Sequence, residues 1–201
     1  MVANILVSFF GIIIFLFLFW KRLKEDYVAE IIFKVASYVL IGISISYFLS
    51  LKFFPIWFLW SAFVGAILGL VLGIITLRVR FYEALEALVI SSLPWIALMF
   101  LGNSVVHSSL SSFLAFGATL IIIFISYWFG DHYKNFTWYK SGKIGFAGLA
   151  TLAVIFFVRS SVAIFGRGVL SFVNQKPEAI ISSVLAFTCC LLIYNLGKDQ
   201  T

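Results

Sequence analysis

The stretch that decides the fold is residues 61–80, SAFVGAILGLVLGIITLRVR. Small residues stand at every fourth position of its apolar run: Ser61, Gly65, Gly69 and Gly73. Arg78 and Arg80 follow the run directly. In lipid, a row of small residues along one helix face lets two helix backbones approach closely. Arginines at the end of an apolar span are typical of the cytoplasmic membrane surface. The stretch therefore predicts a membrane-spanning helix with one face suited to tight helix packing.

The composition of the whole chain indicates that lipid surrounds most of it. The chain has 201 residues, of which 63% are hydrophobic and 11% charged, and its mean hydropathy is +1.14. Soluble domains are about half apolar and about one quarter charged, so this chain is too apolar to fold as a soluble globule. The net charge of +6 is spread thinly along the chain. It indicates lysines and arginines beside anionic headgroups, and no nucleic-acid partner is expected.

Seven apolar runs follow one another along the sequence, each close to the roughly 20 residues that cross a bilayer. They cover residues 4–20, 28–49, 56–77, 84–101, 110–129, 144–166 and 178–196. The connections between them are short. The expected fold class is therefore all-α, a polytopic membrane protein with seven transmembrane helices that form a single transmembrane domain, residues 1–201.

The distribution of positive charge predicts how the helices are oriented. With the N-terminus outside, nine lysines and arginines fall in inner connections and three in outer ones. The inner set is Lys21, Arg22, Lys24, Arg78, Arg80, Lys134, Lys140, Lys143 and Lys198; the outer set is Lys52, Arg167 and Lys176. Because positive residues collect on the cytoplasmic side, we expect the N-terminus outside and the C-terminus in the cytoplasm.

One arginine lies inside a predicted span. Arg159 is in the sixth apolar run, nearer its outer end. Charged residues within spans usually face the bundle interior, a water-filled pocket or lipid phosphate, and they often mark functional sites. The alternative is that Arg159 snorkels to the outer headgroups without any pocket. The sequence leaves both interpretations open.

Two pairs of charged residues have simpler explanations. Glu30 and Lys34 stand four residues apart, which is the spacing of an ion pair on a helix surface. Glu83 and Glu86 come at the start of the fourth predicted helix, where acidic side chains complement the helix dipole. Both pairs are therefore interpreted as structural.

The connection after the fourth predicted span holds further candidates. Gly102 and Asn103 are expected to end the helix, because both tolerate a left-handed backbone. His107, near the outer surface, is a candidate catalytic base, although a single histidine does not define a site. The serines that follow are expected to cap the fifth helix and ease its packing; they are Ser108, Ser109, Ser111 and Ser112.

The histidines and cysteines lack the spacing of metal ligands. His107 and His132 each stand without a second ligand at a suitable distance in the sequence. Cys189 and Cys190 are adjacent in an apolar run, and neighbouring cysteines bridge poorly. No metal or other cofactor is expected, and the cysteines are interpreted as small hydrophobic side chains.

Four segments, spread over most of the chain, carry a family resemblance. They are LIGISISYFL at 40–49, VGAILGLVLG at 64–73, FLGN at 100–103, and YKSGKIGFAGL at 139–149, which leads to Arg159. In turn they resemble a second-helix segment I-G-A-R-L-Y-Y-V-L, a motif H-G-A-L-L-G-x-x-x-G, the end of a signature G-R-x-G-N-F, and a late P-G-Q segment before an arginine. The family that carries these motifs is bacterial prolipoprotein diacylglyceryl transferase, an inner-membrane enzyme with seven transmembrane helices.

The resemblance implies an activity and a set of site residues. The family moves the diacylglyceryl group of phosphatidylglycerol onto the lipobox cysteine of a prolipoprotein. In a transferase with a rearranged site, Arg159 would bind the lipid phosphate, Asn103 would orient the headgroup, and His107 would accept the thiol proton. The other matched substrate-binding positions are Tyr47, Gly65 and Gly102. The implied partners are phosphatidylglycerol or another anionic phospholipid and lipobox-containing prolipoproteins, and the implied location is the bacterial inner membrane, as a multi-pass protein.

Three positions depart from the family pattern. The family histidine falls on Val64, the signature arginine on Phe100, and the second-helix arginine on Ser44. A phosphate leaving group needs positive charge or directed donors, and a thiol needs a route to its thiolate. Valine, phenylalanine and serine supply neither a cation nor a base. Because the loss of one directed donor lowers the rate by roughly 10²–10³, the resemblance supports the fold more strongly than the activity.

Three functions stay open at this stage. The first is a transferase with a rearranged site. The second is a catalytically inactive relative that binds lipid or a membrane protein partner. The third is a small transporter, which requires ionisable pairs inside the membrane and interrupted helices; Pro94, within the fourth span, offers one such interruption.

Overall fold

The computed structural model describes residues 2–133, 145–165 and 176–198. Within these ranges the chain forms seven long α-helices, one short 3-10 helix and no strand. The helices are α1 (Val2–Leu23), α2 (Ala29–Phe53), η1 (Pro55–Trp57), α3 (Phe58–Leu77), α4 (Phe81–His107), α5 (Leu110–His132), α6 (Phe146–Phe165) and α7 (Lys176–Lys198). All seven long helices have the length and hydropathy to cross a membrane. The predicted all-α fold with seven spans is therefore confirmed, and the chain is a multi-pass helical membrane protein.

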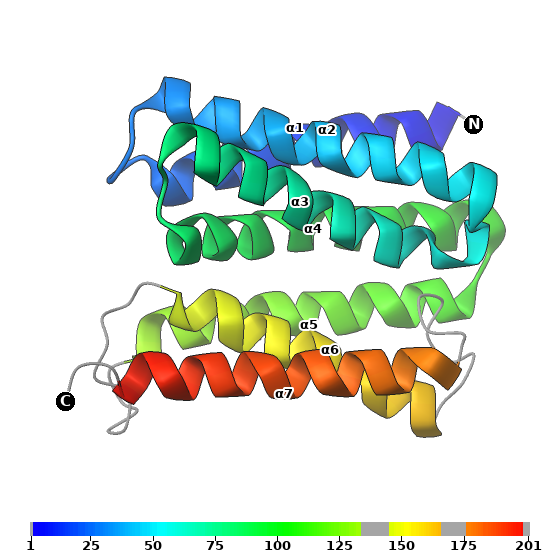
Figure 1. Ribbon diagram of the computed structural model, residues 1–201. Coiled ribbons are helices and arrows are strands. Elements are labelled where there is room, and N and C mark those ends of the chain that lie inside the picture. Colours follow the sequence, from blue (N-terminus) through cyan, green and yellow to red (C-terminus); the bar gives the residue numbers. More distant parts are fainter. Residues whose placement is uncertain (1, 134–144, 166–175, 199–201) are drawn as a thin grey trace.

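The helices run side by side in two layers (Figure 1). Helices α1 to α4 form one layer, and α5 to α7 form the other. Helix α1 begins at one end of the bundle and α7 finishes at the opposite end. We call these the N-terminal end and the C-terminal end of the bundle. The C-terminal end also holds the α1–α2 and α3–α4 connections, where the sequence predicts the cytoplasmic surface.

Helix α4 joins the two layers. It packs against α1 and α3 on one side and against α5 and α6 on the other. It continues through Pro94 without ending. The indole nitrogen of the neighbouring Trp95 is buried and has no hydrogen-bond partner among the described residues, although a partner is expected for a buried indole. The ring itself packs against Phe15 and Gly11 of α1.

The small-residue face of α3 is tightly packed, as predicted, and the structure identifies α2 as its partner. A Cβ atom placed on Gly65 would collide with the carbonyl oxygen of Gly42 and with the side chain of Ser46. Gly69 meets the α2 backbone in the same way. The hydroxyl of Ser61 donates a hydrogen bond of 2.7 Å to the carbonyl oxygen of Ser46. The absence of side chains on this face is therefore what lets the two backbones approach.

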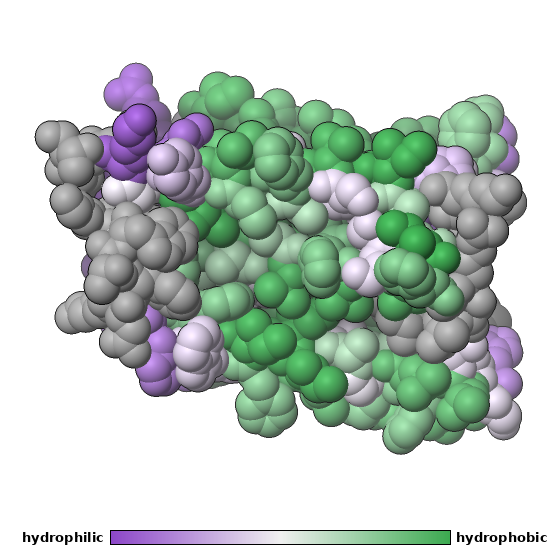
Figure 2. Space-filling model, turned by 90° about the horizontal axis from the view of Figure 1, so that it is seen from below, coloured by the Kyte–Doolittle hydropathy of each residue, from purple (hydrophilic) through white to green (hydrophobic). Residues whose placement is uncertain are grey.

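The outer surface of the bundle is apolar along its length. Figure 2 shows one face, on which hydrophobic residues fill the middle and hydrophilic residues gather at the two ends. On α3 the stripe beside the glycine face is 51% to 71% exposed; it consists of Val64, Leu68, Leu72 and Ile75. Exposed apolar stripes of this kind fit contact with lipid chains.

The end of α4 differs from the sequence expectation. The predicted stop at Gly102 and Asn103 is wrong, because α4 continues to His107 and ends at Ser108, whose φ of 48° is left-handed. Gly102 instead packs against Val7 of α1. The predicted serine cap of α5 is confirmed, since the Ser109 hydroxyl accepts a hydrogen bond from the backbone at the start of α5.

Candidate functional site

Arg159 and Glu178 form an ion pair inside the bundle, near its N-terminal end. Nη2 of Arg159 in α6 lies 3.0 Å from Oε1 of Glu178 in α7, and the two side chains are 4% and 9% exposed. The ring of Trp60 in α3 lies 5.0 Å from the guanidinium carbon. Its Nε1–H donates a 3.2 Å hydrogen bond to the same Oε1 of Glu178. Three helices therefore meet at one buried ion pair, which is also in cation–π contact.

The snorkelling alternative for Arg159 is overturned by this arrangement. The side chain is buried and neutralised by a carboxylate instead of reaching the bundle surface. A buried charge is tolerated when it is paired and hydrogen-bonded. Glu178 is not among the residues predicted from sequence, because an acidic residue in the first turn of a helix has an ordinary helix-dipole explanation. A signal that could have found it is its position just after the connection that follows the arginine-bearing helix.

Serines lie close in sequence to Arg159 on α6 and to Glu178 on α7. The hydroxyls of Ser160 and Ser183 lie 2.6 Å apart across the two helices. Ser183 also donates to the carbonyl oxygen of Ala179 at 2.7 Å. Ser182 is 0% exposed, and its hydroxyl has no hydrogen-bond partner among the described residues. Helix α7 therefore carries two hydroxyl groups, those of Ser182 and Ser183, about one helical turn after Glu178.

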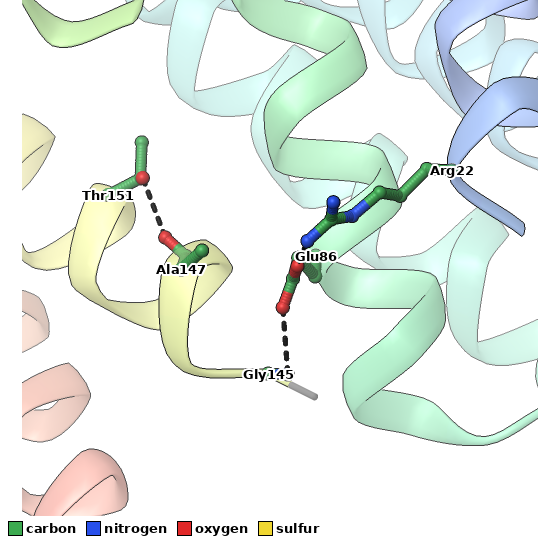
Figure 3. A network of polar contacts seen from close by, with 5 residues as sticks. All are labelled: Arg22, Glu86, Gly145, Ala147 and Thr151. Carbon is green, nitrogen blue, oxygen red and sulfur yellow. Dashed lines mark hydrogen bonds and ion pairs between the residues drawn. The ribbon is translucent and has the colours of Figure 1, made fainter. Parts of the chain in front are cut away.

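A second buried carboxylate lies near the C-terminal end of the bundle. Glu86 of α4 forms an ion pair with Arg22 of α1. Its Oε2 accepts a 2.8 Å hydrogen bond from the backbone N–H of Gly145, just before α6 begins (Figure 3). The expectation that Glu86 complements the dipole of its own helix is wrong, because it lies beyond the first turn of α4 and acts at the N-terminus of α6. It joins three helices that are distant in sequence.

Tyr27, in the α1–α2 connection, links to the start of α4. Its hydroxyl donates a 2.5 Å hydrogen bond to Glu83 and accepts one of 3.1 Å from the backbone N–H of Arg80. The guanidinium of Arg80 pairs with Glu83 at 3.1 Å. Burial, followed by the hydrogen bond to Glu83, raises the pKa of Tyr27. The hydrogen bond and charge of Glu83 raise the pKa of Arg80. Glu83 does lie in the first turn of α4, as predicted.

The other predicted polar and aromatic site residues lie on α2 and α4. Asn103 is exposed near the end of α4 and donates a 2.6 Å hydrogen bond to the hydroxyl of Ser112 in α5. His107 is the exposed last residue of α4. Tyr47 lies on the exposed face of α2. Their described contacts thus differ from those of Arg159, which pairs with α7 and α3.

Other sequence expectations concern packing positions and a surface pair. Gly65 and Gly102, which the resemblance places in substrate binding, both lie in helix contacts, with α2 and α1 respectively. The predicted Glu30–Lys34 pair is confirmed, with Nζ and Oε1 2.6 Å apart.

The positions that depart from the family pattern are exposed or half-buried. Ser44 is exposed on α2, and Val64 belongs to the exposed stripe of α3. Phe100 is half-buried on α4.

Comparisons with known proteins do not define a family. No family model, no curated protein and no solved structure matches the chain. The fold and its ion pairs define only a class, a multi-pass helical membrane protein with a buried carboxylate paired to an arginine near each end of the bundle.

Proposed function

We propose that this chain binds an anionic phospholipid, with phosphatidylglycerol as the first candidate, at the N-terminal end of its bundle. The observation that carries the proposal is Arg159, a cation held inside the membrane-spanning part by three helices. Arginine is the side chain best suited to phosphate, because its planar fork donates two parallel hydrogen bonds. An arginine within a span is expected to have a function. The resemblance to the diacylglyceryl transferases, whose late arginine matches Arg159, supports the same ligand.

In this proposal the chain is a divergent relative of the transferases in the bacterial inner membrane, and it retains lipid binding without thiol transfer. Transfer to a cysteine requires a base near the thiol and donors at the leaving phosphate. Ser44 and Val64 stand at two of the family's charged positions and lie on exposed faces. Phe100, at the third, has no polar side-chain atom. We therefore expect binding of the lipid without its consumption.

The lipid-binding proposal is tested with the full chain in detergent. Short-chain phosphatidylglycerol is titrated against wild-type protein and against Arg159→Gln, with phosphatidylcholine of equal chain length as the lipid control. The expected result is preferential binding of phosphatidylglycerol that Arg159→Gln loses. Arg22→Gln is the matched control, because it also removes an arginine from an ion pair, at the opposite end of the bundle. Unchanged phosphatidylglycerol binding by Arg159→Gln would show the proposal to be wrong.

A separate assay tests transfer. Purified protein is incubated with phosphatidylglycerol and a lipobox peptide, and the peptide is analysed by mass spectrometry. We expect no diacylglyceryl peptide above background. A product that disappears in His107→Ala would replace the binding proposal with an active transferase.

One observation supports the alternative that the protein is a transporter: pairs of ionisable side chains form contacts between the helices. The Arg22–Glu86 and Arg159–Glu178 pairs, however, lie near opposite ends of the bundle. Transporter sites are typically near the membrane midplane, at interrupted helices. Lipid binding therefore accounts better for the arrangement of charges.

A further inference from the structure

The hydroxyl of Ser182 departs from the usual behaviour of serine in a transmembrane helix. Such hydroxyls normally donate to a carbonyl oxygen one turn earlier, as Ser183 does to Ala179 at 2.7 Å. Ser182 is 0% exposed, yet its hydroxyl has no hydrogen-bond partner within the described part of the chain. A buried hydroxyl without a partner destabilises the fold and requires an explanation.

The position of Ser182 connects it with the ion pair. Ser182 lies four residues after Glu178, so the two side chains are neighbours on one face of α7. This face is buried: Glu178, Ser182, Cys189 and Ile193 are all on it. Helix α7 packs against α6, which carries Arg159. The unpartnered hydroxyl is therefore one helical turn further into the bundle than the Arg159–Glu178 contact.

The charges of the Arg159–Glu178 pair explain why a phosphate cannot bind Arg159 while Glu178 stays in place. Glu178 neutralises Arg159, and its Oε1 accepts from both the guanidinium and the indole of Trp60. A phosphate that approaches Arg159 meets this carboxylate and is repelled by it. The two anions compete for the same donors. A phosphate presents its oxygens tetrahedrally, so it can accept from a guanidinium and from a hydroxyl in a different direction.

We infer that Glu178 is an internal competitor that occupies the phosphate site of Arg159, and that Ser182 is a further ligand of the phosphate once the carboxylate moves aside. The inference rests on the proposed function, and it names the residues that regulate and complete that site. The ligand chemistry is a phosphate ester. Glu178 determines how tightly the site binds it, and the Ser182 hydroxyl, which has no partner among the described residues, gains one in the complex.

Two substitutions test the inference by the affinity for short-chain phosphatidylglycerol. Glu178→Gln removes the competing charge but keeps an oxygen that accepts from Trp60, so we expect binding about tenfold tighter or more. Ser182→Ala removes the proposed donor, so we expect binding weaker by about tenfold. The melting temperature of lipid-free Ser182→Ala is expected to stay the same or rise, because an unpaired buried hydroxyl is lost.

Ser183→Ala is the matched control, because it removes a neighbouring hydroxyl that already has partners. It should leave the affinity for phosphatidylglycerol unchanged. If Glu178→Gln does not fold, Glu178→Asp, which withdraws the carboxylate by one carbon, carries the same expectation of tighter binding. Binding that is unchanged or weaker in the Glu178 variant, or unchanged in Ser182→Ala, overturns the inference.

The outcome for Arg159→Gln separates the two proposals. If Arg159→Gln keeps full binding, the proposed function itself fails. If Arg159→Gln loses binding but the Glu178 variant does not gain it, only the present inference fails. Parallel titrations with glycerol phosphate and inorganic phosphate identify the source of the ligand. Binding of these soluble phosphates with the same dependence on Ser182 assigns the site to free phosphates, and binding of phosphatidylglycerol alone assigns it to the lipid.

Discussion

The carboxylate of Glu86 accepts a hydrogen bond of 2.8 Å from the backbone N–H of Gly145, which is 59 residues later in the chain. The first N–H groups of a helix have no partner within it and carry partial positive charge. A carboxylate from α4 therefore accepts a hydrogen bond from a backbone N–H at the start of α6. Its second oxygen forms an ion pair with Arg22 of α1 (Figure 3). Gly145 has a φ of +84°, a conformation that glycine adopts without strain. The side chain of Glu86 thus links three helices near the C-terminal end of the bundle.

Removal of this carboxylate should destabilise the fold. We expect Glu86→Ala to lower the free energy of unfolding by about 2–3 kcal/mol, because it leaves a charge and a helix N-terminus without their partner. The value lies below that for a fully buried pair, since the side chain of Arg22 is 33% exposed and water screens it. The measurement is denaturant unfolding followed by circular dichroism. Glu30→Ala, which breaks an exposed pair on α2, should have no measurable effect, and equal effects of the two variants would contradict the prediction.

The contact between α2 and α3 predicts that two glycines respond differently to the same substitution. Gly65→Ala should lower the free energy of unfolding by about 1–3 kcal/mol, because the new methyl group collides with the backbone of Gly42 and the helices must separate. Gly117→Ala meets nothing within 4 Å. It should leave stability unchanged or raise it by up to about 1 kcal/mol through helix propensity. Thermal unfolding of the two variants in one detergent checks the prediction, which fails if Gly65→Ala is as stable as Gly117→Ala.

The environment of Tyr27 predicts a dependence on alkaline pH. Its pKa is raised, first by burial and then by its hydrogen bond to Glu83. The neutral phenol is therefore stabilised by folding: its contribution is fully present below the ordinary pKa of about 10 and is lost as the pH rises through the higher folded-state value. The difference between alkaline absorbance titrations of wild type and Tyr27→Phe isolates this residue. Its ionisation should occur above the ordinary pKa, and Glu83→Gln should move it downwards. Ionisation at or below pH 10 would contradict the assignment.

The predicted orientation in the membrane is tested by cysteine labelling. In a background with Cys189→Ala and Cys190→Ala, single cysteines are introduced as Asp26→Cys, in the α1–α2 connection, and Lys52→Cys, at the end of α2. A membrane-impermeant maleimide added to intact cells should label the second variant and leave the first unlabelled until the cells are opened. The reverse pattern would show that the N-terminus is cytoplasmic.

Some features of this protein follow from sequence because their cause is local. A span is recognised from the hydropathy of about 20 consecutive residues, and the packing face of α3 from small residues at a spacing of four. Both predictions are confirmed. The prediction that α4 stops at Gly102 and Asn103 was wrong, because it used only a local property, the tolerance of both residues for a left-handed backbone. That local property does not reveal that Gly102 contacts α1 or that Asn103 donates a hydrogen bond to Ser112 of α5.

The amino-acid sequence by itself determined that lipid surrounds the helices, how many spans there are, and that α3 has a face suited to close packing, because each depends on composition or on a short repeat. Only the tertiary structure decided which charges are neutralised. Arg159 has its counter-ion 19 residues away in another helix, and Arg22 has its own 64 residues away. Such pairing depends on which helices become neighbours and on how each is rotated about its axis. Those quantities are set by the packing of the whole bundle, so no local pattern around either arginine encodes them.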